Sequence, residues 1–377
     1  MVQSPSFTMG VEEEYWLVDK DSGDLIEKQP PELMQDMIAV LGEQVTKEFH
    51  GSQIEIGTKI CSSSKEVHDE LVRLRGTIAE IAQKYDLAII ASSTHPSAEW
   101  DRQGHSEGDH YESLVQDFQQ VILRLLICGM HVHVGIEDED LRMDLLNQMT
   151  YFLPHLLAIS TSSPFWRGKN MGLHSYRLSL FDNLPRSGLP ERFESYSEYQ
   201  RFIDILVDSK AIDNPAKIWW DLRPSMKWPT LEMRVTDICT NLQDAVCLAS
   251  ITRCLFRAMY RLRCQNLSWR KYPNTLINQN RWMAQRYGTT HGLIDIGRGE
   301  IRPYKELVDE LVEIIEPDIE HFGCADEVMH VYKIIEQGTS AQKQVAVYEQ
   351  ALEKSGLPSS AIFKVKQFLM RETLLGT

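Results

Sequence analysis

Acidic and imidazole side chains recur at alternate positions in short stretches that have the composition of β-strands. His131 and His133 occur in the run Gly-Met-His-Val-His-Val-Gly, and Glu12 and Glu14 occur in Gly-Val-Glu-Glu-Glu-Tyr. Because side chains at positions i and i+2 point to the same face of a strand, the two members of each pair share a face. Such polar faces are costly inside a protein unless they bind something, which makes metal ions and phosphate the first candidate ligands.

The same spacing pairs an acid with an arginine in two later stretches, Asp221 with Arg223 and Glu232 with Arg234. Pairs of this kind usually form cross-strand salt bridges. The alternative assigns the acids to a metal ion and the arginines to phosphate or carboxylate, which the planar guanidinium group binds well. The residues alone leave both interpretations open.

The acidic run at the start of the chain favours a cation. Its neighbours Val11, Tyr15 and Trp16 are apolar enough to bury the strand, and buried like charges at Glu12 and Glu14 would need a counter-ion. Glu13 points the other way, so we expect it to face solvent or to pair locally. His131 and His133 have an equally ordinary interpretation as hydrogen-bonded histidines of a half-buried strand.

Other charged residues are weaker candidates. Glu55 stands between Ile54 and Ile56, as either a pocket residue or an edge charge. Judged alone, Arg177, Arg186 and Arg281 are more often surface charges than ligands. The chain has no Gly-x-x-x-x-Gly-Lys-Ser/Thr loop, no Gly-x-Gly-x-x-Gly fingerprint and no Gly-x-Ser-x-Gly elbow. If it uses a nucleotide, we therefore expect divalent cations and arginines to hold the phosphates.

Length and composition limit the class of protein. The chain has 377 residues, with 54 Asp and Glu against 39 Lys and Arg and a formal charge of −15, which argues against nucleic-acid or anionic-membrane partners. No stretch approaches the roughly 20 apolar residues of a membrane helix, and no secretory signal is expected. The seven cysteines are scattered without a Cys-x-x-Cys pair, so we expect buried free thiols in a reducing cytoplasm.

These residues must be positioned by alternating strands and helices. The pattern predicts strands near 7–18, 45–60, 87–91, 129–135, 217–224 and 230–238, helices near 31–42, 65–84, 110–126 and 140–159, and a long loop over 163–192. We expect one domain over 1–377 with a helical C-terminal third, about 243–377. Strands alternating with helices could form a parallel doubly wound sheet, but strands with one polar face favour an α+β fold with one working face.

The ordered set of motifs resembles the bacterial glutamate–cysteine ligase type 2 family of carboxylate–amine ligases. The matching runs are Phe7 to Glu14, Ser93 to Pro96, Gly129 to Gly135, Ser175 to Arg177, Trp220 to Ser225, Leu231 to Asp237, and Asn280-Arg281 with Arg286 to Gly288. The family is similar in its core to glutamine synthetase and the guanido kinases. The resemblance implies a curved, mainly antiparallel sheet with helices packed on its outer face.

The resemblance also implies roles for individual residues. Glu12, His131 and Glu232 would hold the Mg²⁺ (or Mn²⁺) nearer the ATP phosphates. Glu14 and Glu55 would hold the cation nearer the acceptor carboxylate. Arg223 and Arg234 would neutralise the transferred phosphoryl group and would contact the nucleotide together with His133 and Arg281. Arg177, with the 163–192 loop, is the candidate for binding a substrate carboxylate.

The chemistry implied is ATP-dependent amide-bond formation through an acyl phosphate, with an amino-acid carboxylate and an amine as small-molecule substrates. Glutamate–cysteine ligase activity and a homodimer are expectations from the resemblance. An alternative from another class is a metal-dependent amide hydrolase that uses His131 and His133 on zinc. A third interpretation is a non-catalytic binding protein on the same scaffold. The presence of every expected acidic residue argues against it.

Overall fold

A seven-stranded sheet forms the centre of the computed structural model, which describes residues 4–106 and 108–377. The strand order is β10-β11-β5-β1-β3-β2. The strand β4 pairs with the C-terminal part of β1, after the part that pairs with β3. All strand pairs of this sheet within the described residues are antiparallel, which confirms the α+β prediction. The strands are β1 (Met9–Asp19), β2 (Val45–Lys47), β3 (Gln53–Gly57), β4 (Leu87–Ile90), β5 (Met130–Gly135), β10 (Leu222–Pro224) and β11 (Thr230–Met233).

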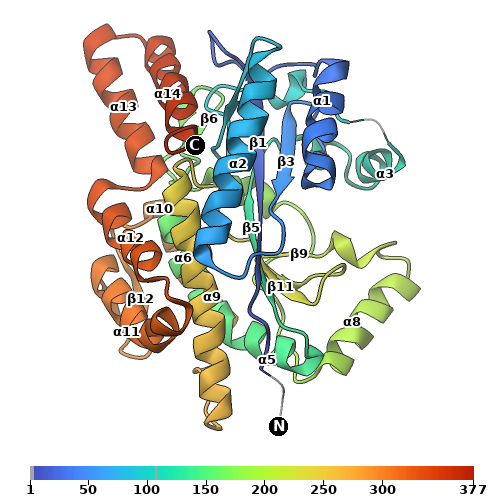
Figure 1. The fold of residues 1–377 in the computed structure, drawn as a ribbon, viewed down its shortest axis with the longest axis vertical. Helices are drawn as coiled ribbons and strands as arrows, with labels where there is room; N and C mark the ends of the chain where they lie inside the picture. The colour runs from blue at the N-terminus through green and yellow to red at the C-terminus, as the bar shows by residue number, and fades with distance from the viewer. Residues whose placement is uncertain (1–3, 107) are drawn as a thin grey trace.

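The main helical layer packs on one face of this sheet. Val11, Val132 and Met233 are fully or almost fully buried on that face and belong to the main hydrophobic core. The core is completed by α2 (Ser64–Gln83), α5 (Glu139–Met149) and α9 (Leu242–Cys264). Figure 1 shows α2 and α9 crossing in front of the sheet. The opposite face carries the charged side chains predicted to do chemistry.

Glu13 was expected to face solvent or to pair locally, and this prediction is wrong. It is fully buried on the core side of β1, and Arg75 from α2 donates to both of its carboxylate oxygens, at 2.5 and 3.0 Å. The remaining guanidinium hydrogens of Arg75 reach the carbonyl oxygens of Cys239 and Thr240. Its partner is 62 residues away in the chain. The prediction was wrong because a local sequence pattern cannot show an ion pair between residues that far apart.

Three predicted segments are more divided than the sequence indicated. The 110–126 helix is split at Gln119, whose φ of 51° ends α3 (Asp109–Phe118) before α4 (Gln120–Leu123). The 140–159 helix is α5 followed, after a 3₁₀ turn, by α6 (Leu153–Ser160). The predicted 163–192 loop contains the hairpin β6–β7 (Phe165–Trp166, Lys169–Asn170), α7 (Tyr176–Phe181) and β8 (Ser187–Gly188), which pairs in parallel with β9 (Trp219–Trp220).

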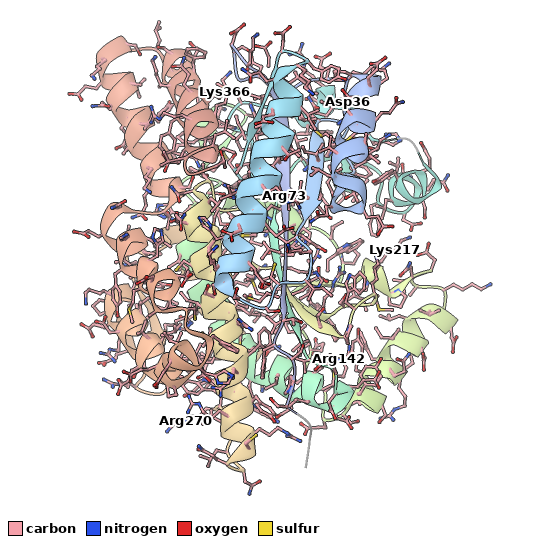
Figure 2. The ribbon with its side chains drawn as sticks, in the orientation of Figure 1. Asp36, Arg73, Arg142, Lys217, Arg270 and Lys366 are labelled. Carbon is pink, nitrogen blue, oxygen red and sulfur yellow. The ribbon has the colours of Figure 1, made fainter. Side chains whose placement is uncertain are left out.

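The chain from Leu242 onward forms a helical layer on one side of the sheet, interrupted by the hairpin of β12 (Leu293–Asp295) and β13 (Glu300–Arg302). Figure 2 shows Arg270 beside the end of α9 and Lys366 on α14, at opposite ends of this layer. The other elements are α1 (Pro31–Leu41), α8 (Tyr196–Asp208), α10 (Asn274–Tyr287), α11 (Tyr304–Phe322), α12 (Ala325–Gln337), α13 (Ser340–Ser355) and α14 (Pro358–Thr373).

The cysteines are free thiols, as expected, but Cys264 is exposed while the other six are buried. Among the described residues, no helix is long and apolar enough to cross a membrane.

Candidate active site

The register of the sheet brings the charged side chains of its open face together. Glu12 on β1 lies opposite His131 on β5, and Glu14 lies opposite Glu55 on β3. On the other side of β5, Glu232 of β11 lies opposite His133. Alternation within each strand keeps all of these side chains on the same face, so the predicted pairs become two adjoining groups of acids.

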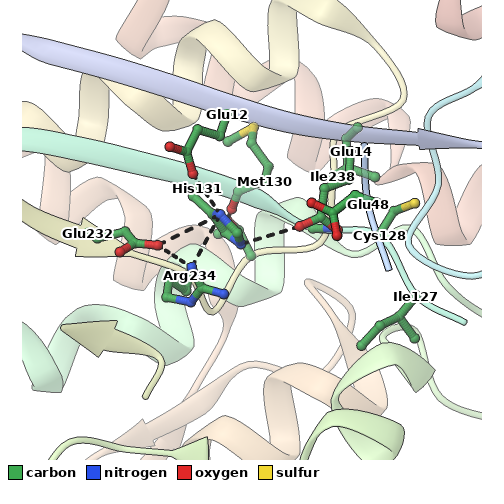
Figure 3. A network of polar contacts seen from close by, with 12 residues as sticks. Glu12, Glu14, Glu48, Ile127, Cys128, Met130, His131, Glu232, Arg234 and Ile238 are labelled. Carbon is green, nitrogen blue, oxygen red and sulfur yellow. Dashed lines mark hydrogen bonds and ion pairs between the residues drawn. The ribbon is translucent and has the colours of Figure 1, made fainter. Parts of the chain in front are cut away.

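The first carboxylate group consists of Glu12, His131 and Glu232, whose potential ligand atoms all lie within 4.8 Å of one another. His131 Nδ1 is 3.1 Å from Glu12 Oε2 and 3.8 Å from Glu232 Oε1. Burial and the charge of Arg234 lower the pKa of His131, which keeps its ring neutral and able to offer a lone pair. Figure 3 shows this ring between Glu232 and Arg234 on one side and Glu14 on the other.

Two arginines converge on the first carboxylate group. Arg223 Nε donates to Glu232 Oε2 at 2.8 Å, and Arg234 forms an ion pair with the same carboxylate. Burial disfavours the charged form of Glu232, yet the two guanidinium groups outweigh it and hold its pKa well below the ordinary value. The Nε atom of Arg234 is buried and has no hydrogen-bond partner. This guanidinium can therefore accept a further anion.

His133 also lies on the open face, beside the first carboxylate group. Its Nδ1 is 2.9 Å from the Thr230 hydroxyl and its Nε2 is 3.3 Å from Glu12 Oε1. Burial lowers the pKa of His133, but the acids Glu12 and Glu232 outweigh burial and raise it. The ring is therefore held in place between Thr230 and Glu12.

The second carboxylate group consists of Glu14, Glu48 and Glu55, again with ligand atoms within 4.8 Å. Burial and the charge of Glu14 raise the pKa of Glu48 to about 7. Burial and the charges of Glu48 and Glu12 raise the pKa of Glu55 well above its ordinary value. Three carboxylates this close repel one another, and a divalent cation would relieve that repulsion.

Glu48 is the member of this group that the sequence interpretation missed. It directly follows β2, in which Thr46 lies opposite Glu55. Positions 46 and 48 alternate with Lys47, so Glu48 shares the face of Thr46 and therefore that of Glu55. The signal was present in the sequence, but it depended on knowing that β2 pairs with β3.

Arg177 lies next to both groups. It is 3% exposed, and its terminal nitrogens donate to the carbonyl oxygens of Val235 and Arg234 at 3.4 and 3.2 Å. Its Nε is buried and has no hydrogen-bond partner. Burial lowers its pKa. The charges of Asp237 and Glu14 act on it from beyond ion-pair distance, so this buried guanidinium can still take up an anion.

Arg281 lies outside both carboxylate groups. Its guanidinium binds Asp221 at 2.6 Å and Asp182 at 2.7 Å, and the two acids occupy its Nε and both terminal nitrogens. Its role as a nucleotide contact stays a prediction, which these ion pairs do not favour. Asp221 thus pairs with Arg281 rather than with Arg223. Arg186 donates to the Lys217 carbonyl and likewise lies apart from the groups.

A cavity opens on each side of the acids. The larger, of about 430 Å³, is lined by Glu12, Glu55 and His133 together with Lys227 and Trp228 of the β10–β11 turn. The smaller, of about 210 Å³, is lined by Glu14, Glu48, His131, Arg177 and Arg234 and by apolar side chains. The two carboxylate groups therefore stand between two spaces that could each receive a substrate.

The donor set fits divalent metal ions. Both groups are rich in carboxylate oxygen, and the first adds one neutral imidazole, a combination that suits Mg²⁺ or Mn²⁺. His131 Nε2 is buried without a hydrogen-bond partner and lies 3.8 Å from Glu14, which leaves a free nitrogen between the groups. Groups this acidic beside unused arginine nitrogens are suited to binding phosphate through cations.

Comparison with known proteins agrees with this geometry. The family model described as glutamate-cysteine ligase family 2 (GCS2) matches residues 8–358. A putative glutamate–cysteine ligase 2 of Rhodospirillum rubrum is 50% identical over 377 residues, which cover 99% of this chain and 97% of the relative. A protein of the same name from Jannaschia sp. is 48% identical, over 97% of this chain and 96% of its own length.

Solved structures share the fold at low sequence identity. A glutamate–cysteine ligase from Francisella tularensis in complex with AMP superposes with a TM-score of 0.67 at 15% identity, covering 97% of this chain and 89% of that one. A bifunctional glutathione synthetase from Pasteurella multocida also gives 0.67, at 14% identity, and this chain spans 52% of that protein.

Proposed function

This chain belongs to glutamate–cysteine ligase family 2 and is a carboxylate–amine ligase of that kind, and we propose that it couples ATP cleavage to amide-bond formation through an acyl phosphate. The observation that carries the proposal is the pair of carboxylate groups on one sheet face, with Arg223 and Arg234 beside the first and Arg177 beside both. The similar ligase that binds AMP supports the use of an adenine nucleotide.

The proposed reaction has two steps. A carboxylate oxygen of the acid attacks the γ-phosphorus of ATP, the bond from that phosphorus to the bridging oxygen breaks, and ADP leaves. The amine nitrogen then attacks the acyl carbon, inorganic phosphate leaves, and the nitrogen loses a proton. Neither step needs a covalent enzyme intermediate, which fits a site made of Glu, His and Arg without a nucleophilic Ser or Cys.

The residues of the chain position and neutralise charge in this scheme. Arg234, with its unused Nε, and Arg223 would bind the phosphoryl group in transfer, where charge develops. Bound Mg²⁺ would supply further neutralisation of the phosphates, held by Glu12, His131 and Glu232. We extend the predicted second set, Glu14 and Glu55, by Glu48, because the three acids form one group.

We assign the two substrates to different cavities. The larger cavity, with Glu12, Glu55 and His133, has room for a nucleotide, and we assign His133 to its contact. The smaller cavity contains Arg177, which we assign to the substrate carboxylate. No observation favours the amide hydrolase, because both groups are dominated by carboxylate oxygen rather than by the histidines that a catalytic zinc site prefers.

An ADP-release assay with MgATP tests the proposal. The names of the relatives make glutamate and cysteine the first acid and amine to supply. We expect Glu14→Gln and Glu232→Gln to abolish ADP release while the circular dichroism spectrum stays that of the folded parent. Glu80→Gln, an exposed acid on α2, is the matched control. Amide formation without nucleotide, or full activity in both variants, would refute the proposal. The homodimer stays a prediction, which light scattering tests.

A further inference from the structure

The smaller cavity has walls of opposite character. One wall carries the acids of the second carboxylate group together with Arg177 and Arg234. The other wall is apolar and is formed by Phe49, Leu114, Ile122, Ile127, Phe181 and Leu184. The cavity therefore presents charge at one end and hydrocarbon at the other.

The apolar wall is not part of the main core. Its six side chains form a separate hydrophobic cluster, contributed by α3, α4, α7 and the segments that follow β2, α4 and α7. A satellite core under surface elements would be close-packed. This cluster instead borders about 210 Å³ of open volume, more than the roughly 150 Å³ that suffices to hold a benzene molecule in an apolar cavity.

Charged and aromatic residues contact the cluster's helix α3. Lys217 Nζ, which Figure 2 shows beyond the sheet on the side of α8, is 2.6 Å from Asp117 on α3 and 2.9 Å from Asp213. Trp219 packs edge-on against Phe118, with ring centroids 5.4 Å apart. An ion pair and a ring contact therefore fasten the apolar wall to the segment that carries Lys217 and Trp219.

Arg177 joins the two walls. Its guanidinium carbon lies 5.4 Å from the ring centroid of Phe181, and its buried Nε has no hydrogen-bond partner, so this nitrogen can donate to a bound anion. A carboxylate bound there would also lie near the second carboxylate group and its cation. The rest of the same molecule would then extend over the apolar wall.

The cavity holds few charged groups. Among the described residues that line it, the only acids are Glu14 and Glu48, and the only cations are Arg177 and Arg234. The Gln53 amide donates to the Ile127 carbonyl at 2.7 Å, and the Tyr111 hydroxyl donates to the Lys47 carbonyl at 2.9 Å. An ammonium group on the body of the acid would find no carboxylate there except those of the cation site, and burying it unpaired would be costly.

We propose that the acid activated by this protein is a monocarboxylic acid with a compact apolar body, a single ring or a branched chain, rather than glutamate. The inference rests on the proposed function, whose acid substrate it specifies. The carboxylate binds between Arg177 and the second carboxylate group, and the body fills the apolar wall. Discrimination follows because glutamate would bring a second carboxylate and an ammonium group into a wall of hydrocarbon.

Hydroxylamine as a surrogate amine tests this without knowledge of the natural amine. Its nitrogen attacks the acyl carbon of the acyl phosphate, phosphate leaves, a proton is lost to the buffer, and a hydroxamate forms. The parent protein is incubated with MgATP, hydroxylamine and one acid: 3-phenylpropionate, 4-methylpentanoate or glutamate. We expect kcat/KM for ADP release to be at least about tenfold higher with the two apolar acids than with glutamate.

The outcomes separate the two proposals. ADP and hydroxamate formed with glutamate but with neither apolar acid would overturn this inference and leave the proposed function standing. No ADP with any acid would overturn both.

A size series at Leu184 tests whether the apolar wall contacts the acid. We expect Leu184→Ala to favour a bulkier acid, 3-(2-naphthyl)propionate, over 3-phenylpropionate by about tenfold relative to the parent, and Leu184→Phe to shift the ratio the other way. A merely structural role would lower activity with both acids equally, and that result would overturn the assignment. Ile127→Ala, on a different segment, provides a second variant should Leu184→Phe fail to fold. Ile205→Ala, an exposed apolar residue on α8, is the control.

Discussion

Arg177 occupies space that exists only because residue 129 is a glycine. A Cβ atom built at Gly129 would lie 2.6 Å from Arg177 Nη2. The same glycine donates its backbone N–H to Glu14 Oε2 at 2.7 Å. One residue directly before β5 therefore fixes the approach of the buried guanidinium and the orientation of Glu14 in the second carboxylate group.

The first prediction follows from this contact. Gly129→Ala should push Arg177 out of its position and lower kcat/KM for ADP release about 100-fold, because a displacement of about 1 Å in a reacting site can cost that much. Gly76→Ala, on α2 with open space around its Cβ, should leave activity unchanged and stabilise the helix by about 0.5–1 kcal/mol. Equal activity of Gly129→Ala and the parent would show that the position of Arg177 set by Gly129 does not limit the reaction.

Removing one acid of the second carboxylate group should weaken cation binding. In the parent, we expect Mg²⁺ or Mn²⁺ to raise the thermal midpoint, because an ion bound only to the folded state stabilises it. In Glu48→Gln that rise should shrink, and the cation concentration for half-maximal ADP release should increase about tenfold or more. Without cation the variant should be at least as stable as the parent, since the repulsion among Glu14, Glu48 and Glu55 is reduced. An unchanged response to cation would exclude Glu48 as a ligand.

The buried pair on the core face gives a prediction about stability alone. Arg75→Met should lower the free energy of unfolding by about 3–5 kcal/mol, because Glu13 is left charged and unpaired in the core. Arg73→Met, on the same helix but exposed, should cost less than about 1 kcal/mol in urea unfolding. Glu13→Gln combined with Arg75→Met should recover part of the loss. Loss of activity in Glu13→Gln at unchanged stability would instead place Glu13 in the active site.

Buried histidines should make the protein less stable in mild acid. Burial lowers the pKa of His50, His95 and His155 to about 4. Between pH 6.5 and 4 the unfolded chain binds protons that the folded protein does not, so the free energy of unfolding is greatest above pH 6.5 and falls as the pH drops toward 4. Each group contributes up to about 1.4 kcal/mol per pH unit in that range.

His95 is the most direct test of this dependence. Its Nε2 lies 2.9 Å from the Gly23 carbonyl, and its Nδ1 accepts from the backbone N–H of Ala98 at 3.1 Å, so both nitrogens are committed to the neutral ring. Urea unfolding at pH 7.5 and 5.5 should show a smaller difference for His95→Gln than for the parent. His291→Gln, which replaces an exposed histidine, should keep the full difference.

Alternation within single strands was enough to predict most of the site. The pairs Glu12/Glu14 and His131/His133 lie on one face because that relation depends only on the period of a strand. Relations between strands were not predictable in the same way. Arg223 contacts Glu232 because β10 pairs with β11, and Glu48 joins its group because β2 pairs with β3. Asp221 contacts Arg281 because α10 lies beside it in the fold.

Helix boundaries show the same limit. The residues of α3 and α4 keep an apolar face throughout, so periodicity alone predicted one helix. The helix breaks at Gln119, which has a positive φ. The sequence did not indicate this break because the residue is not a glycine. The ion pair of Glu13 with Arg75 was missed because its two members are 62 residues apart.

The three consecutive acids of β1 also specify its register in the sheet. If β1 paired one residue out of step, Glu12 and Glu14 would enter the hydrocarbon interior, where Arg75 could neutralise only one of them, and Glu13 would be stranded among the arginines. Such a misfolded sheet would carry an uncompensated charge that the native one avoids. The three acids therefore disfavour a shifted register of β1, so the same residues that form the site also favour the native pairing of the sheet.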